Sequence, residues 1–226
     1  MIRRLLLVRH GVTTWNREGR FQGRLDPPLD PLGELEATYL AERLATEEPR
    51  PSWIVSSPLQ RAVSTARILR DRLAPDGELE LDDGLVEISA GEWEGSTHAE
   101  LRARDGQRYA AWRDSGGELE PPGGESLPAA RQRVAATVDA LLSGAPDGTD
   151  TLLLVSHGGI LRLAAGQLLG LPDAAVWDWE VHNASLSTLA REATGDWRVV
   201  TWNDVGHLRG RPDLDRDEAD GQPLIL

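Results

Sequence analysis

The sequence contains no cysteine and no lysine, and each absence removes a class of chemistry. Without cysteine there are no disulfides, no thiolate nucleophile and no cysteine-ligated zinc. Because all 24 basic residues are arginine, there is also no Schiff-base lysine and no P-loop lysine. No apolar run approaches the ~20 residues that a membrane-spanning helix needs. The chemistry must therefore come from histidine, arginine, acidic and hydroxyl side chains.

Acidic residues outnumber basic ones and give a formal net charge of -13. A duplex nucleic acid or an anionic membrane surface needs a basic face, so this charge argues against both partners. An anionic substrate remains possible, because steering depends on the local field in a cleft. The first residues enter an apolar strand at once, without the features of a signal peptide. We therefore expect a cytoplasmic protein that binds neither nucleic acid nor membrane.

Two apolar segments far apart in the sequence end in the same dipeptide, His-Gly. Residues 5–11 end in Arg9-His10-Gly11, and residues 152–159 contain Ser156-His157-Gly158-Gly159. Continuously apolar runs of this length are typical of strands buried on both faces of a parallel sheet. If the two strands are neighbours, both imidazoles lie at the carboxyl edge of the sheet, where open α/β sheets bind ligands. The pattern predicts a phosphate site there; the alternative is two ordinary buried strands with incidental histidines.

The remaining segments alternate between strand and helix patterns. We predict an α/β fold, a three-layer α/β/α sandwich with a mostly parallel central sheet, one antiparallel edge strand and a small helical lid insertion. Helices are expected to begin at Asp30-Pro31, Ser57-Pro58 and Ser126, which carry cap and proline signals. Further strands are expected at 53–56, 79–81, 185–189 and 197–202, the last two as an antiparallel pair at one edge.

The chain is expected to form one domain over residues 1–208, followed by an acidic, poorly ordered tail at 209–226. Residues 89–125, rich in glycine and tryptophan, are expected to form a lid with helices near 97–104 and 107–114. A homodimer contact is possible at the edge strand and at Trp177 and Trp179, which we expect to be exposed.

Four blocks in order give the chain a resemblance to the histidine phosphatase superfamily, also called the phosphoglycerate mutase-like family. The blocks are Arg9-His10-Gly11 with Thr13, Trp15 and Asn16; Ser56-Ser57-Pro58-Leu59-Gln60-Arg61-Ala62; Glu87 with Gly91-Glu92-Trp93-Glu94-Gly95; and Val155-Ser156-His157-Gly158-Gly159. The resemblance covers residues 3–207 and is strong because all four blocks occur in family order.

The resemblance implies a role for each matching residue. His10 would be the nucleophile that forms a phosphohistidine, and Glu87 would be the general acid and base. Arg9, Arg61 and His157 would surround the phosphoryl oxygens, as guanidinium groups suit phosphate geometry. Substrate or phosphate contacts are further implied for Thr13, Asn16, Gln22 and Gly23. The implied site needs no metal and no cofactor, and its partner is a small-molecule phosphomonoester.

Several of these residues also have simpler interpretations. Arg61 lies in the first turn of a helix, where it could be a solvated surface charge. Trp93 is expected to pack under the lid, and His98 is expected to be exposed. The lid arginines could contact a second anionic group or pair with neighbouring acids; they are Arg102, Arg104, Arg108 and Arg113.

The family contains phosphatases and mutases, and the residues after Glu87 favour a phosphatase. Cofactor-dependent mutases of the family carry Arg-His-Tyr-Gly after this glutamate, whereas this chain has Ile88-Ser89-Ala90-Gly91. The pattern is closest to the small-molecule phosphatases of the family. Two alternatives from other classes are a metal-dependent hydrolase using His10, His157 and Asp26, and a non-catalytic phospho-ligand sensor. The presence of His10, Glu87 and His157 together argues against the sensor.

Overall fold

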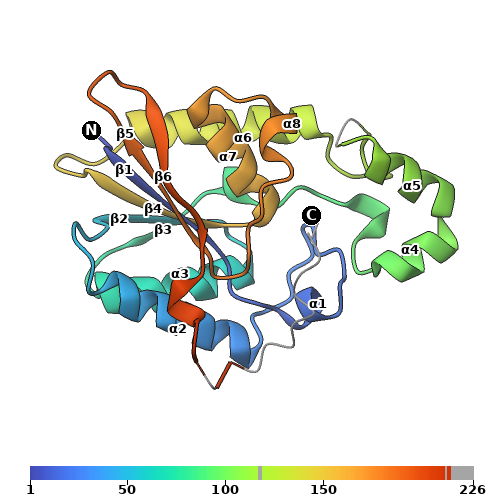
Figure 1. Ribbon diagram of the computed structural model, residues 1–226, viewed down its shortest axis with the longest axis horizontal. Coiled ribbons are helices and arrows are strands. Elements are labelled where there is room, and N and C mark those ends of the chain that lie inside the picture. The colour runs from blue at the N-terminus through green and yellow to red at the C-terminus, as the bar shows by residue number, and fades with distance from the viewer. Residues whose placement is uncertain (117–118, 212, 215–226) are drawn as a thin grey trace.

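The computed structural model describes residues 1–116, 119–211 and 213–214, which form a sheet between two layers of helices (Figure 1). The sheet has the strand order β3-β2-β4-β1-β5-β6. Strands β1 to β4 are parallel, whereas β5 is antiparallel to β1 and β6 is antiparallel to β5. The strands are β1 (Arg4–Arg9), β2 (Trp53–Ser56), β3 (Leu79–Leu81), β4 (Thr151–Ser156), β5 (Leu186–Arg191) and β6 (Trp197–Asp204). This architecture confirms the predicted mostly parallel α/β fold.

Alternating side chains of the central strands supply two separate cores. Leu5 and Leu7 of β1 pack with helices α6 (Leu127–Ser143) and α7 (Gly158–Leu169). Leu6 and Val8 face the other way and pack with α2 (Pro31–Leu44) and α3 (Gln60–Leu73). Because successive side chains of a strand point to opposite faces, the continuously apolar run serves both layers at once.

The predicted lid insertion contains η2 (Gly91–Trp93), α4 (His98–Arg104) and α5 (Gly106–Asp114), which project beside the sheet in Figure 1. Its own small core is made of six buried residues, namely Phe21, Ala90, Trp93, Leu101, Tyr109 and Trp112. Trp93 is buried there, as predicted. The prediction of an exposed His98 is wrong: its Nδ1 lies 2.7 Å from the hydroxyl of Tyr109 and its ring 4.7 Å from that of Phe21.

Two further predictions are corrected by the packing. Helix α3 is capped by Leu59 rather than Ser57, and the Ser57 hydroxyl instead contacts His157. Trp177 is buried in the α6–α7 core rather than exposed, and Trp179 is half-buried against Trp202. The homodimer contact therefore remains a prediction resting on the β6 edge alone.

Several short elements lie between the main ones. They are α1 (Thr14–Arg17), α8 (Asp173–Val176), η1 (Asp83–Leu85) and η3 (Gly206–Leu208). None of the helices in the described ranges combines the length and hydropathy needed to cross a bilayer. The predicted acidic tail lies largely outside the described residues, and the domain boundary at 208 remains a prediction.

Candidate active site

The two histidines lie side by side at the carboxyl edge of the sheet. Strands β1 and β4 are paired in parallel with Arg9 opposite Ser156, so that His10 and His157 occupy the next register position. Their ring centroids are 5.1 Å apart, and both side chains are buried. The hypothesis that the two His-Gly strands are neighbours is therefore confirmed.

The Nδ1 atom of His10 lies 2.8 Å from the carbonyl oxygen of Gly11. A carbonyl can only accept a hydrogen bond, so we assign the proton of the neutral ring to Nδ1, which leaves the lone pair on Nε2. The backbone around the ring is held in place, because the Thr65 hydroxyl accepts from Gly11 N at 3.0 Å. A Cβ at Gly11 would lie 2.3 Å from the carbonyl oxygen of Gly33, so only glycine allows this close approach.

Two buried arginines lie in the same cluster. Arg61 is fully buried, and its guanidinium donates to the carbonyls of Gly23 at 2.8 Å and Leu25 at 2.7 Å. Arg9 donates to the carbonyl of Val181 at 2.5 Å. The Nε atoms of both arginines are buried and have no hydrogen-bond partner among the described residues. The interpretation of Arg61 as a surface charge is therefore wrong, and both groups retain donors for an anion.

Glu87 places a carboxylate beside both arginines. Its carboxylate accepts hydrogen bonds from the backbone N–H of Ile88 at 2.9 Å and of Gly159 at 3.4 Å. Burial lowers the pKa of Arg9 and of Arg61 to about 10, and the nearby charge of Glu87 partly offsets this effect. Both arginines are therefore cations at neutral pH.

The four residues implied to contact substrate lie near this cluster, on the segment that begins α1 and on the loop that follows it. Thr13 caps α1 and donates from its hydroxyl to Asn16 Oδ1 at 3.0 Å, and the same oxygen accepts from Asn183 Nδ2 at 3.3 Å. Gln22 is buried, and its Oε1 has no hydrogen-bond partner in the described part of the chain. Gly23 has a φ of +50°, and a Cβ there would lie 2.2 Å from the Glu94 carboxylate.

Three residues near the site were not assigned to it by sequence. Ser57 contacts Nε2 of His157 at 2.8 Å, and Asn183 donates to the carbonyl of His10 at 3.0 Å. Arg162 is buried on α7 and donates to the carbonyl of Trp179 at 2.7 Å. A Cβ at Gly158 would lie 3.8 Å from both Arg162 Nη1 and Arg9 Nε, so the two guanidinium groups flank that glycine. A lone charge inside the apolar segment 160–169 was the available signal for Arg162.

The pKa of His10 and the pKa of His157 both lie well below the ordinary value of 6.5. Burial is the main cause for each, and the charges of Arg61 and Arg9 add to it, because a protonated ring would be poorly solvated and close to cations. Both rings are therefore neutral in the free protein at neutral pH, as a nitrogen nucleophile requires.

These lowered pKa values predict how stability depends on pH. Below about pH 6.5 the two histidines bind protons in the unfolded chain but stay neutral in the folded protein. The free energy of unfolding therefore falls as the pH drops, by up to ~1.4 kcal/mol per pH unit for each ring. Urea unfolding of wild type and His157→Gln between pH 5 and 7.5 measures this, and we expect a smaller slope for the variant. Equal slopes for the two proteins would contradict the prediction.

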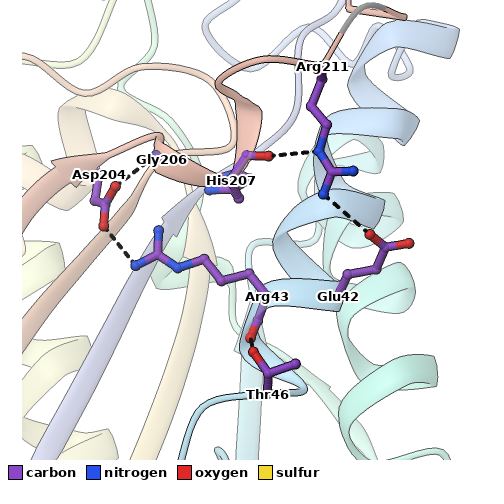
Figure 2. A pocket seen from close by; sticks show the side chains of 7 residues that line it. All are labelled: Glu42, Arg43, Thr46, Asp204, Gly206, His207 and Arg211. Atoms are coloured by element: carbon purple, nitrogen blue, oxygen red, sulfur yellow. Dashed lines mark hydrogen bonds and ion pairs between the residues drawn. The ribbon is translucent and has the colours of Figure 1, made fainter.

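A separate pocket of about 510 Å³ lies between α2 and the end of β6 (Figure 2). Its cations are already paired: Arg43 donates to Asp204 at 2.7 Å, and Arg211 Nη2 lies 3.6 Å from Glu42. With its positive charges neutralised by neighbouring carboxylates, this pocket offers no site for an anion comparable to the buried cluster.

The chain is an α/β protein with two buried histidines and two buried arginines clustered at the carboxyl edge of its parallel strands, where open α/β sheets bind ligands. The chain belongs to the histidine phosphatase superfamily (branch 1), whose family model matches residues 5–205. This membership confirms the family resemblance and the prediction of a phosphatase-type enzyme. Across the described residues, no three His, Asp or Glu side chains converge as a metal site would require.

Named relatives share most of their length with this chain. Glucosyl-3-phosphoglycerate phosphatase of Mycolicibacterium vanbaalenii is 38% identical over 221 residues, covering 89% of this chain and 95% of the relative. Metal-independent phosphoserine phosphatase of Arabidopsis thaliana is 33% identical, covering 97% of this chain and 89% of the relative. A solved mycobacterial glucosyl-3-phosphoglycerate phosphatase in complex with VO3 has a TM-score of 0.79 at 35% identity, covering 89% of this chain and 98% of that chain.

Proposed function

We propose that this chain is a metal-independent phosphomonoesterase that hydrolyses a small phosphorylated metabolite through a phosphohistidine on His10. The observation that carries the proposal is the neutral His10 ring. Its Nδ1–H donates a hydrogen bond to the Gly11 carbonyl, so its Nε2 is available as a nucleophile. It lies in a cluster with two buried guanidinium groups that retain donors. A covalent intermediate divides one difficult displacement into two easier ones.

The proposed reaction has two steps. First, Nε2 of His10 bonds to phosphorus while the bond from phosphorus to the leaving oxygen breaks. Glu87 acts as the general acid and gives a proton to that oxygen, so the alcohol departs neutral. Second, the Glu87 carboxylate takes a proton from water, whose oxygen attacks phosphorus and releases inorganic phosphate from His10. No metal and no cofactor takes part in either step.

The remaining site residues bind rather than react. Arg9, Arg61 and His157 hold the phosphoryl oxygens, and their fixed donors stabilise the charge that develops during transfer. We assign substrate or phosphate contacts to Thr13, Asn16, Gln22 and Gly23. Gln22 has the strongest support, because a substrate hydroxyl would satisfy its buried, unpartnered Oε1.

Relatives support hydrolysis over mutase chemistry. Those described above are named phosphatases, one of them metal-independent, and one solved structure is named as a complex with VO3. A mutase must hold its dephosphorylated intermediate and exclude water. The segment after Glu87 in this chain lacks the Arg-His-Tyr-Gly run of the mutases.

The test is phosphate release in the presence of EDTA. The panel comprises p-nitrophenyl phosphate, 3-phosphoglycerate, glucosyl-3-phosphoglycerate, phosphoserine and sugar phosphates. We expect release that resists the chelator. Loss of activity that added divalent metal restores would favour a metal hydrolase. Isomerisation of 3-phosphoglycerate with 2,3-bisphosphoglycerate, without net release, would favour a mutase. Phosphate binding without turnover would favour a sensor.

We also propose that the substrate carries a carboxylate near its phosphate, as phosphoserine and phosphoglycerate esters do. Arg24 directly follows Gly23, whose carbonyl accepts a hydrogen bond from Arg61. The guanidinium of Arg24 lies 3.2 Å from the Glu125 carboxylate, on the Glu87 side of the site. Arg24 is exposed, and Glu125 also pairs with Arg133 through two hydrogen bonds, so a substrate carboxylate can take Arg24 while Glu125 keeps Arg133 as its partner. The lid arginine Arg108 is a second exposed cation, which pairs with Asp105 at 3.8 Å.

Arg24→Ala is therefore expected to raise KM for phosphoserine by about 5- to 30-fold, because a charge-assisted hydrogen bond contributes roughly 1–2 kcal/mol. The KM for p-nitrophenyl phosphate, which has no carboxylate, should change little. Steady-state kinetics with both substrates measures the difference. The same selective loss in Arg108→Ala, with Arg24→Ala unaffected, would assign the carboxylate to the lid instead.

A further inference from the structure

Glu87 stands on a segment without regular structure, between η1 (Asp83–Leu85) and η2 (Gly91–Trp93). A general acid must lie within hydrogen-bond reach of the leaving oxygen, and a displacement of about 1 Å can greatly reduce the rate. Glu87 lies in neither a helix nor a strand, and its carboxylate receives one long hydrogen bond from a helix, that from Gly159 N–H at the start of α7 at 3.4 Å. A bond of this length leaves the carboxyl dependent on the contacts that hold the backbone of its own segment.

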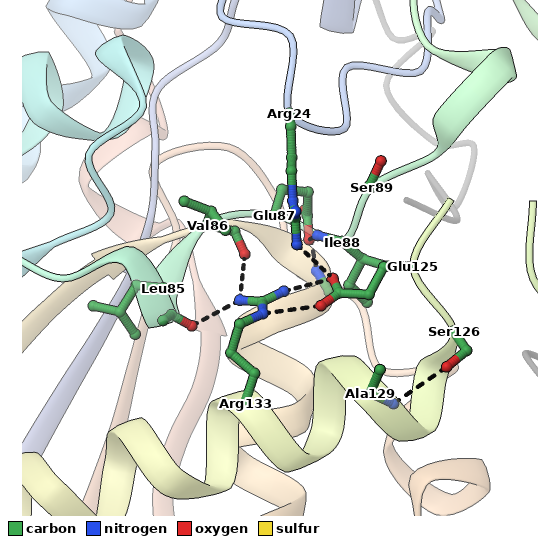
Figure 3. Close-up of polar contacts among 12 residues, drawn as sticks. Arg24, Leu85, Val86, Glu87, Ile88, Ser89, Glu125, Ser126, Ala129 and Arg133 are labelled. Atoms are coloured by element: carbon green, nitrogen blue, oxygen red, sulfur yellow. Dashed lines mark hydrogen bonds and ion pairs between the residues drawn. The ribbon is translucent and has the colours of Figure 1, made fainter. Parts of the chain in front are cut away.

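Arg133 provides the first set of these contacts, as Figure 3 shows. It projects from α6, and its Nη1 donates to the carbonyls of Gly84 at 2.8 Å and Val86 at 2.9 Å. Its other edge makes a two-point contact with Glu125, from Nε at 3.0 Å and from Nη2 at 2.6 Å. Paired bonds of this kind fix orientation as well as distance.

Glu125 provides the second set of contacts from the loop before α6. Its backbone N–H donates to the carbonyl of Ser89 at 3.0 Å. Arg133 therefore donates to the carbonyl of Val86, before Glu87, and Glu125 donates to the carbonyl of Ser89, after it. The side chains of Arg133 and Glu125 are in turn hydrogen-bonded to each other. Both side chains are largely shielded, with 20% and 13% exposure for Arg133 and Glu125. A paired, shielded contact of this kind is stiffer than an exposed ion pair.

We infer that Arg133 and Glu125 form a positioning pair that holds the Glu87 carboxyl for proton transfer to the leaving oxygen. The inference rests on the proposed role of Glu87 as general acid. The pair touches none of the reacting atoms of the proposed mechanism. The pair acts through the backbone of residues 84–89, and its loss should resemble a partial loss of the acid.

The leaving group separates this role from a general structural one. Nitrophenolate departs without help from an acid, whereas an alkoxide needs a proton as the bond to phosphorus breaks. For Arg133→Met we expect kcat/KM to fall by about 10- to 100-fold for alkyl phosphates, within the range of general-acid effects, with a much smaller change for p-nitrophenyl phosphate. Arg133→Lys keeps the positive charge but loses the two-point contact of the guanidinium with Glu125. Its kcat/KM for alkyl phosphates should therefore lie between those of Arg133→Met and wild type.

Glu87→Gln is the benchmark and Arg131→Met is the matched control. Arg131 lies on the same helix, is 53% exposed and pairs with Asp173 at 3.6 Å, so its variant should behave as wild type. All variants are first compared by thermal unfolding. If Glu87→Gln discriminates between leaving groups but Arg133→Met loses activity equally on all substrates, or on none, the positioning inference is overturned. If Glu87→Gln itself shows no discrimination, the proposed acid role fails instead.

Discussion

Replacing His10 with alanine is expected to lower the rate of phosphate release by a factor of about 10⁴ to 10⁶, the range found when a covalent nucleophile is removed. The reason is that the contact of His10 Nδ1 with the Gly11 carbonyl leaves the lone pair on Nε2. His157 is also neutral, but its Nε2 lies 2.8 Å from the Ser57 hydroxyl, and we assign its Nδ1, which has no partner among the described residues, as a donor to the phosphoryl oxygens. The variant would have to rely on direct attack by water.

The measurement is a rapid-quench experiment with ³²P-labelled substrate. Wild type should carry label that survives alkali and is lost in acid, as expected for a phosphohistidine, and His10→Ala should carry none. The control is binding of inorganic phosphate, which the variant should retain because Arg9 and Arg61 remain. Labelling of the variant, or turnover close to wild type, would place the nucleophile elsewhere.

Arg61→Met is expected to reduce kcat/KM by about 10²- to 10³-fold, comparable to removing a fixed oxyanion donor. Its guanidinium is fully buried and hydrogen-bonded to two carbonyls, so we expect it to stabilise the transferring phosphoryl group without reorganising. Stability should respond much less than activity. The variant loses those two hydrogen bonds, but it also removes a desolvated charge that lies close to Arg9.

Thermal unfolding with and without vanadate, together with steady-state kinetics, tests this separation. Vanadate should raise the Tm of wild type and have little effect on the Tm of Arg61→Met, because a ligand stabilises only the fold that binds it. Arg67→Met is the matched control, since Arg67 is an exposed residue of the same helix. Equal kinetic losses in the two variants would mean that the effect comes from α3 rather than from the phosphate site.

Local sequence signals predicted most of the secondary structure. The Asp30-Pro31 cap and the apolar period define α2, and Ser126 caps α6 as expected. The lid helices at 97–104 and 107–114 correspond to α4 and α5. The short helices α1 and α8 were not predicted, because four residues carry too little periodicity to distinguish a helical turn from a loop.

Membership of the buried cluster could be predicted where a sequence motif contains the residue, as at His10, Glu87 and His157. It could not be predicted where a residue changes its partner through tertiary contact. Ser57 has the sequence context of a helix cap, yet its hydroxyl contacts His157. Arg133 and Glu125 look like ordinary surface charges in the sequence, yet they hold the backbone on both sides of Glu87.

The sequence by itself determined the family, the layers of the fold and the paired His-Gly strand ends, because these depend on local periodicity and on motifs in order. Only the tertiary structure decided that Arg61 is buried, that His98 joins the aromatic cluster and that Trp177 packs into the core. Burial depends on which elements pack against a residue. Strand order and helix packing set those neighbours across long stretches of chain, and a local pattern cannot encode them.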